Sequence, residues 1–430
     1  MRNGIPISEL SKLYQDAVKT CRQLGVRYLW IDSLCIIQDQ ELDWTHEIAT
    51  MGQVYSNALC NIEAAHAADG HGQLFFSRNG AQIKPFPVTV EWHKDGPLAS
   101  FLIDSSVHRD NDMSDAPLLK RAWVLQEQIL ASRTIIYSKR QVHWVCRTQE
   151  ASEMFPEGMP DLRRGIDLLS RSLAPRSLHV LKGQLASDNP LYFSHQSLGS
   201  GMIVSPLESF WWSWRTIVMD YTSRALTFEK DKLAAIAGIA SVIERKIKVP
   251  YVAGMWNFRF FIEYELCWRA GKQSNGQAPF RPKDYRAPTW SWASIEGSIS
   301  YRHKEDPDIS GDGQLAFVED AKTETIDGTP TGPVKSGFIR ITGPLAEKHN
   351  YAYEPDDEAD PRPKTVFFLA MFNLFCDQKV WGLALRRLEC GSNQGCYERI
   401  DTFCFYEDDG LYDGLYNEFC NLPEQLITII

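Results

Sequence analysis

The sequence predicts an α/β N-terminal domain with an open sheet, followed by a helical region and a β-rich C-terminal part. Three observations support this prediction. The first 65 residues alternate between helical and strand patterns, residues 151–285 show mainly helical periodicity, and residues 286–430 contain short apolar runs separated by Gly and Pro. We therefore expect three regions, formed by residues 1–150, 151–285 and 286–430.

The first predicted helix runs from about Ser8 to Leu24 and leads directly into a strand. Ser8 suits the start of a helix and Gly25 suits its end. The next run, Arg27–Ile31, is short, aromatic and branched, and it lies between Gly25 and Asp32. This pattern is typical of a buried strand.

A second helix is expected from about Asp43 to Ser56, and a second strand at residues 58–64. Glu47 lies four residues after Asp43, at the edge of the apolar face of the helix. That face consists of Trp44, Ile48, Met51 and Tyr55. Right-handed crossovers would make residues 58–64 a parallel neighbour of the first strand, Arg27–Ile31.

Polar residues follow the first strand, where open α/β sheets bind their ligands. Asp32 and Ser33 occupy this position. Asp32 has two structural alternatives, since it can also cap the following turn or pair with Arg27 or Arg121. Arg121 can hold a phosphate or Asp32, but a structural ion pair is the better interpretation.

Residues 117–146 predict a helix followed by a hairpin. Pro117 suits the first turn of a helix that ends near Leu130. Its expected buried face consists of Leu119, Trp123, Gln126 and Leu130. Residues 135–138 and 141–146 then form two strands around Lys139 and Arg140.

The rest of the chain carries further helices and strands. Helices are expected at residues 209–222, 231–248 and 255–270. After Pro288, strands are expected at residues 315–318, 338–342, 365–369 and 399–405. Residues 349–364 predict an exposed acidic loop.

Composition excludes several classes of protein. A net charge of −10 argues against a broad nucleic-acid-binding surface, which needs clustered Lys and Arg. The longest apolar run, residues 233–243, is too short to span a membrane, and the N-terminus lacks the apolar core of a secretory signal. The 10 cysteines include no CxxC pair. We expect a cytoplasmic protein with reduced thiols and no bound cofactor.

Metal and thiol chemistry receive little support from the sequence. His143 and Cys146 are three residues apart on a predicted strand, where their side chains point to opposite faces. We therefore expect no metal site. Cys35 with His46 is a conceivable nucleophile and base, but Cys35 lies among apolar residues and a buried, inert thiol is the better interpretation.

Three sequence blocks resemble the heterokaryon-incompatibility (HET) domain of filamentous fungi. They are YLWIDSLCIIQDQ at residues 28–40, DWTHEIATMGQVYSNA at residues 43–58 and LLKRAWVLQEQILASRTIIYSKRQVHWVC at residues 118–146. The resemblance implies a distantly TIR-like, Rossmann-like sheet and a role in allorecognition and programmed cell death. Partners would be other incompatibility or NLR-type proteins, or further copies of the chain.

Some TIR domains hydrolyse NAD, so the resemblance also implies NAD as a possible substrate. Those domains place a catalytic glutamate after a D-W-x-x-x-E-like pattern, which residues 43–48 resemble with one intervening residue fewer. Glu47 would then be the catalytic carboxylate, with Trp44 or Trp30 stacked on the nicotinamide. Asp32, Ser33 and Arg121 would complete the substrate-binding residues. Alternatively, Glu47 is a surface acid beside a packed helix face.

HET domains normally begin with a strand and a Ser-Tyr-x-Trp-Gly-like motif before the first helix. This sequence begins almost at that helix, so we expect an open sheet without its first strand and with an exposed edge. The functional alternatives are an NAD-consuming death effector, a non-catalytic module that acts by self-association or partner binding, and an inactive paralogue.

Overall fold

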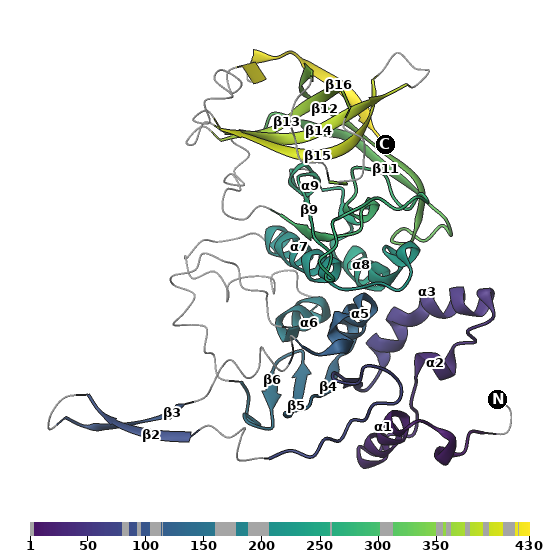
Figure 1. Cartoon of the computed structure of the whole chain (residues 1–430), viewed down its shortest axis with the longest axis vertical. Helices are drawn as coiled ribbons and strands as arrows, with labels where there is room; N and C mark the ends of the chain where they lie inside the picture. Colours follow the sequence, from purple (N-terminus) through teal and green to yellow (C-terminus); the bar gives the residue numbers. More distant parts are fainter. Residues whose placement is uncertain are drawn as a thin grey trace. The chain divides into compact units, whose positions relative to one another are not determined.

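A computed structural model of the chain consists of two compact units (Figure 1). The first contains residues 1–168 and 176–187, and the second contains residues 169–175 and 188–430. The structure describes residues 4–79, 86–92, 96–103, 113, 115–159, 178–187, 206–258, 260–301, 313–349, 356–357, 363–374, 379–389, 395–406, 418–419 and 421–430. The predicted acidic loop at residues 349–364 lies largely outside these ranges.

The first unit is built on a four-stranded mixed sheet. Its strands follow the order β1 (Asn61–Ala64), β4 (Arg133–Tyr137), β5 (Val142–Cys146) and β6 (Glu150–Ser152). β1 and β4 are parallel, whereas β4, β5 and β6 pair antiparallel. The predicted hairpin at residues 135–146 is therefore confirmed. The Rossmann-like or TIR-like topology stays a prediction.

The predicted strand at Arg27–Ile31 is wrong. Its residues lie outside the described strands, and β1 pairs with β4 instead. Tyr28 is 81% exposed, which does not suit a buried strand. The carbonyl of Ile31 accepts the N–H groups of Leu34 and Cys35, at 3.0 and 2.8 Å. The end of the run thus starts the single turn α2 (Asp32–Cys35) rather than a ladder between strands.

The first predicted helix is α1 (Lys12–Gln23), which starts later than expected. Ser11, rather than Ser8, caps it by accepting the N–H of Tyr14. Residues 7–9 form the short 3-10 helix η1 (Ile7–Glu9). The buried Asp16 of α1 accepts the N–H of Leu74 at 3.2 Å and thereby ties the loop after β1 to the helix.

The helices α3 (Glu41–Asn57) and α5 (Ala122–Leu130) confirm two further predictions. The 3-10 helix η3 (Pro117–Lys120) leads into α5, which packs against both α3 and α6 (Leu178–Ala186). A separate two-stranded hairpin is formed by β2 (Phe86–Glu91) and β3 (Leu98–Ile103). Most of α5 is buried, including the predicted Gln126 and Leu130, whereas Leu119 and Trp123 are only partly buried.

The second unit begins with helices. α7 (Pro206–Ser223) and α8 (Ala234–Ile247) confirm two predicted helices, and the 3-10 helix η6 (Glu229–Asp231) lies between them. The predicted helix at residues 255–270 is wrong in extent. This stretch contains β8 (Met255–Trp256), paired with β7 (Tyr251–Val252), then the six-residue α9 (Phe261–Leu266) and β9 (Arg269–Gly271). Phe260 adopts a φ of 74°, which a continuous helix does not allow.

The C-terminal part is rich in β structure, as predicted. Residues 292–294 form the 3-10 helix η7 (Trp292–Ser294), and β10 (Ser298–Ser300) pairs with β9. The main sheet contains β11 (Phe317–Thr325), β12 (Val334–His349), β13 (Thr365–Leu374), β14 (Lys379–Leu388), β15 (Cys396–Tyr406) and β16 (Glu424–Ile429). The sheet closes on itself because the long β12 pairs with both β13 and β16. The sequence patterns anticipated strands within β11, β12, β13 and β15 but missed β14 and β16.

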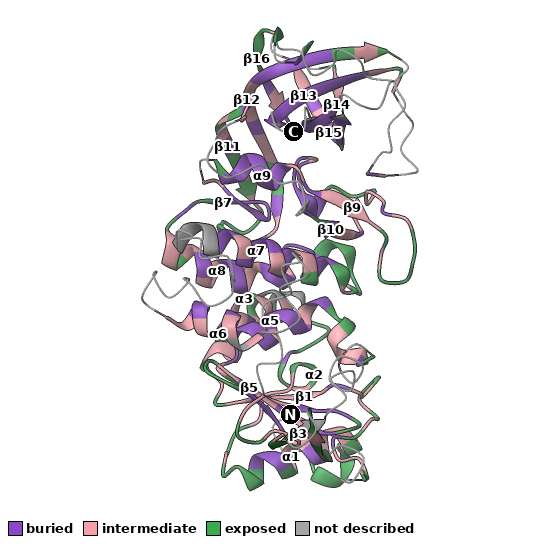
Figure 2. Ribbon diagram, turned by 90° about the vertical axis from the view of Figure 1, so that its left-hand side faces the viewer, coloured by how far each residue is buried: buried purple, intermediate pink, exposed green. Residues whose placement is uncertain are grey.

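Tryptophans form much of the core of the second unit. The fully buried ones are Trp214, Trp256, Trp268, Trp290 and Trp292. Figure 2 also marks much of the C-terminal sheet as buried. Among the described residues, the structure contains no helix with the length and apolar character needed to cross a membrane.

Candidate functional site

A partly buried carboxyl group lies between two helices of the first unit. The hydroxyl of Tyr55, on the last turns of α3, donates a hydrogen bond to Glu127 Oε2 at 2.8 Å. Glu127 belongs to α5, which packs against α3. The ring of Trp30 meets Tyr55 edge to face, with ring centroids 5.7 Å apart. The packing of two amphipathic helices therefore places an aromatic pair beside a carboxyl group.

The surroundings of Glu127 place its protonation equilibrium near neutral pH. Burial raises the pKa of Glu127 to about 7, and the hydrogen bond from Tyr55 opposes this shift. The negative charges of Glu63 and Asp32 raise the pKa of Glu127 further, whereas the positive charge of Arg121 lowers it. A carboxyl with this pKa is present in both protonation states at neutral pH, as an acid or base catalyst requires.

Tyr55 remains a hydrogen-bond donor over the same pH range. Burial raises the pKa of Tyr55 well above that of a free phenol, and the charge of Glu127 raises it further. The phenol proton therefore stays on Tyr55, where it is directed at Glu127. This hydrogen bond fixes the position of the carboxyl group relative to α3.

A second carboxylate lies deeper in the unit. Glu63 on β1 is 2% exposed and accepts two hydrogen bonds of 2.9 Å, from Asn61 Nδ2 and Gln128 Nε2. Lys182 on α6 lies in the same buried region, and its Nζ donates to the carbonyl of Ala131 at 2.7 Å. Burial lowers the pKa of Lys182 to about 8, and the charge of Glu63 opposes that shift. These buried hydrogen bonds connect α5, which carries Glu127, to β1 and to α6.

Three of the predicted site residues interact either with Tyr55 or with the charge of Glu127. Trp30 contacts Tyr55, and both Asp32 and Arg121 act on the pKa of Glu127. Asp32 begins α2, and its Oδ1 accepts the N–H of Ser33 at 2.7 Å. This contact is with the adjacent residue, and α2 has Ile31 at its N-cap without a side-chain cap, so the alternatives for Asp32 stay predictions. Arg121 is exposed at the N-terminal boundary of α5.

Ser33, Trp44 and Glu47 lie in other surroundings. The hydroxyl of Ser33 is 2.7 Å from that of Tyr14 on α1. Trp44 and Glu47 are both partly buried on α3, and Tyr55 follows Glu47 by eight residues, roughly 12 Å along the helix. The charges that act most strongly on Glu127 are those of Glu63, Asp32 and Arg121, not that of Glu47. The catalytic role of Glu47 stays a prediction.

Sequence reasoning assigned no role to Tyr55 or Glu127. Tyr55 was placed on the apolar face of its helix, which concealed its hydroxyl. Glu127 lies within the consecutive polar residues Gln126, Glu127 and Gln128 of an otherwise apolar helix. Consecutive residues lie about 100° apart on a helix, so three in a row cover more than half of its circumference. That pattern could have indicated a buried polar site.

Cys35 and His46, the conceivable thiol nucleophile and its base, both lie on the surface of the first unit. The expectation that Cys35 is buried is wrong, because α2 is a single turn that buries Ile36 and leaves Cys35 exposed. His46 is also exposed, on α3. Within the part of the chain that the structure describes, no group of three His, Cys, Asp or Glu side chains is arranged to hold a metal ion.

Comparison with known families gives one match. Comparisons with curated proteins and with solved structures give no significant match. The family model described as "Heterokaryon incompatibility protein (HET)" matches residues 1–127. This range contains Trp30, Asp32, Tyr55, Arg121 and Glu127. The similarity to the heterokaryon-incompatibility (HET) family thus covers residues 1–127, less than half of the chain.

Proposed function

We propose that this chain is a heterokaryon-incompatibility effector whose N-terminal unit hydrolyses NAD at the bond between ribose and nicotinamide. The observation that carries the proposal is the Glu127 carboxyl. It receives a hydrogen bond from Tyr55, its pKa responds to the charges of Asp32, Glu63 and Arg121, and burial raises that pKa to about 7. Perturbed carboxyl groups of this kind are typical of catalytic sites.

The chemistry requires a base rather than an acid. When the bond between C1′ and the nicotinamide nitrogen breaks, its electron pair neutralises the pyridinium charge, so the leaving group needs no proton. Water then attacks C1′ of an oxocarbenium-like centre and must lose a proton. Glu127 in its ionised form would accept that proton, and the carboxylate of Asp32 would stabilise the positive charge that develops on the sugar.

Trp30 and Arg121 suit two parts of NAD, the nicotinamide ring and the diphosphate. Trp30 presents an aromatic ring beside Tyr55, and such a ring can stack on nicotinamide. Arg121 is exposed at the boundary of α5, where its guanidinium can bind the diphosphate of NAD. The family resemblance favours Glu47 as the catalytic carboxylate, whereas the pKa and hydrogen bonding of Glu127 favour Glu127.

The test measures nicotinamide release from NAD by the purified full chain, at dilute and at self-associating concentrations. The variants Glu127→Gln and Glu47→Gln each remove one carboxylate and keep nearly the same shape. Loss of turnover in Glu127→Gln with retention in Glu47→Gln supports the proposed site. The reverse pattern overturns the role of Glu127 in favour of Glu47.

A non-catalytic module is the second candidate, and exposed apolar side chains of the first unit favour it. Leu24, Tyr28, Ile37 and Leu59 are between 47% and 81% exposed. Where such side chains form a contiguous patch, they mark a site of association with further copies or with other incompatibility proteins. If wild-type protein releases no nicotinamide under either condition while it self-associates in sedimentation experiments, NAD hydrolysis is overturned and this second function is supported.

A further inference from the structure

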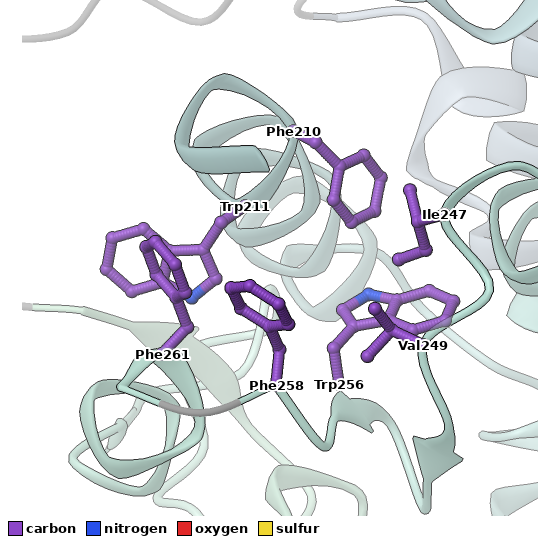
Figure 3. A pocket seen from close by; sticks show the side chains of 7 residues that line it. All are labelled: Phe210, Trp211, Ile247, Val249, Trp256, Phe258 and Phe261. Carbon is purple, nitrogen blue, oxygen red and sulfur yellow. The ribbon is translucent and has the colours of Figure 1, made fainter. Parts of the chain in front are cut away.

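The hairpin of β2 and β3 carries large apolar side chains on its surface. Trp92, Leu98 and Phe101 are 67%, 70% and 44% exposed. The rings of Trp92 and Phe101 meet edge to face, with centroids 5.9 Å apart. In the second unit, by contrast, such rings pack together in the interior, as those of Trp211 and Phe261 do at 5.0 Å (Figure 3). The hairpin thus exposes the kind of side chain that the second unit buries.

The same hairpin is a sheet of only two strands. Among the described strands, β2 and β3 pair with each other and not with the four-stranded sheet of the first unit (Figure 1). A hairpin of two strands is at best marginally stable in water, whereas three or more strands with an apolar face can be stable. A further strand at one edge would therefore stabilise this hairpin.

Pro87 determines which backbone groups of the hairpin point outward. It lies opposite Leu102 in the register, and because proline has no N–H to donate, this is a non-hydrogen-bonded pair. Such pairs alternate with hydrogen-bonded ones along an antiparallel ladder. Thr89 and Ser100 therefore form the next non-hydrogen-bonded pair, and their hydroxyl oxygens are 3.3 Å apart. It follows that the N–H and C=O groups of Leu98, Ser100 and Leu102 form the outer edge of β3.

The two outer edges of the hairpin differ in their protection. The edge of β2 contains Pro87, which lacks a donor, and the charged Glu91. Proline and charged residues are common means by which an edge strand is protected from pairing with another chain. β3, with the sequence LASFLI, contains neither. Its edge can therefore accept one further strand.

We propose that the edge of β3 pairs antiparallel with β3 of a second copy of this chain, about a two-fold axis at Ser100. In this register Ser100 lies opposite Ser100 of the second copy, and Leu98 lies opposite Leu102. The outward-pointing groups of both strands then meet and can form up to about six backbone hydrogen bonds. The contact does not depend on NAD hydrolysis. It gives the second candidate function, self-association, a defined surface.

The sequence of β3 suits pairing with itself. In the register about Ser100, Phe101 lies beside Ala99 of the second copy, on the face that also carries Val88 and Trp92. The apolar faces of the two hairpins thus join into one. Because β3 contains no charged residue, the new ladder brings no like charges together. The sheet grows from two strands to four, and the contact is closed, as in most homodimers.

Sedimentation equilibrium of the full chain in reducing buffer tests this proposal. Because the contact is small, we expect a dimer with a dissociation constant on the order of 100 μM. Ser100→Pro removes the central outward N–H of β3 and should raise this constant at least about tenfold. Thr89→Pro is the matched control, because it makes the same change in the residue opposite Ser100, on the edge of β2. It should change the constant less than about twofold.

A cysteine substitution tests the register of the pairing. The Cα atoms of the two copies of Ser100 would be about 5.5 Å apart, a separation that a disulfide can span. Ser100→Cys should therefore give a covalent dimer on mild oxidation, with the cross-linked residues identified by peptide mass spectrometry. Thr89→Cys, on the edge of β2, should give no cross-link at that position.

Three results would overturn the proposal, with folding of each variant verified by circular dichroism. The first is a wild-type chain that stays monomeric up to about 1 mM. The second is a dimer that Ser100→Pro and Thr89→Pro weaken equally or not at all, which would move self-association to another surface. The third is a lack of cross-linking through Ser100→Cys, which would contradict the two-fold register. None of these measurements involves NAD, so their failure is distinct from a failure of the proposed hydrolysis.

Discussion

At the residue scale, the hydrogen bond between Tyr55 and Glu127 is the most informative contact of the first unit. It lowers the pKa of Glu127 against the stronger effect of burial. We expect Tyr55→Phe to raise the pKa of Glu127 by about one unit, because the ionised carboxylate loses its donor. Titration of the Glu side-chain carbons by NMR measures the shift. Tyr14→Phe is the control, since the Tyr14 hydroxyl contacts Ser33 rather than Glu127. An unchanged Glu127 titration in Tyr55→Phe would contradict this expectation.

A second prediction concerns Glu265, which is 0% exposed on α9. Burial raises the pKa of Glu265 to about 8. The folded state therefore binds more protons than the unfolded state between about pH 4.5 and 8. It follows that this carboxyl reduces the stability of the second unit as the pH rises through that window.

Glu265→Gln should remove this dependence. As the pH rises from 5 to 8, the unfolding free energy of the wild type should fall, and that of the variant should not fall for this reason. The difference between the two should therefore grow in favour of the variant by an amount on the order of 2 kcal/mol. Urea unfolding at both pH values, followed by tryptophan fluorescence, measures the difference. The exposed Glu229 is the site for the control substitution Glu229→Gln. If Glu265→Gln and Glu229→Gln show the same pH dependence, the assigned protonation of Glu265 is wrong.

At the element scale, α6 belongs to the first unit although it follows the family match in the sequence. Lys182 attaches it by donating to the carbonyl of Ala131 and to Thr134 Oγ1, at 2.7 and 2.8 Å. Lys182→Met keeps the length of the side chain but leaves both acceptors without this donor. We expect a loss of about 1–3 kcal/mol in the unfolding free energy of the first unit. Denaturant unfolding measures the loss, and the exposed Lys139→Met should cost less than about 0.5 kcal/mol. Equal effects of the two substitutions would show that α6 is not attached in this way.

Periodicity predicted the elements of this protein better than it predicted their partners. The helical stripes identified α3 and α5, because an apolar face repeats locally in the sequence. The run Arg27–Ile31 has the composition of a strand, yet strand formation depends on a neighbouring ladder that composition does not encode. The site was anticipated only in part for the same reason. Trp30, Asp32 and Arg121 could be selected as aromatic or charged residues, whereas Glu127 gains its importance from the Tyr55 hydroxyl, 72 positions away.

At the scale of the whole molecule, the family match and the folded unit have different extents. Residues 1–127 include β1 but exclude its partner β4 as well as β5, β6 and α6. A fragment of residues 1–127 would leave β1 without its ladder and the apolar face of α5 without cover. We expect this fragment to lack cooperative unfolding and dispersed amide signals in NMR spectra, whereas residues 1–187 should show both. A folded 1–127 fragment would contradict the unit boundaries described above.

The pH dependence of NAD cleavage by the full chain tests the central claim most directly. If Glu127 is the base, kcat/KM for nicotinamide release should rise with pH along a limb with an apparent pKa of about 7. That limb should move to higher pH in Tyr55→Phe and remain in Glu47→Gln. A rate that does not change between pH 5 and 8, or a limb that Tyr55→Phe leaves in place, would contradict the assignment of Glu127 as the catalytic base.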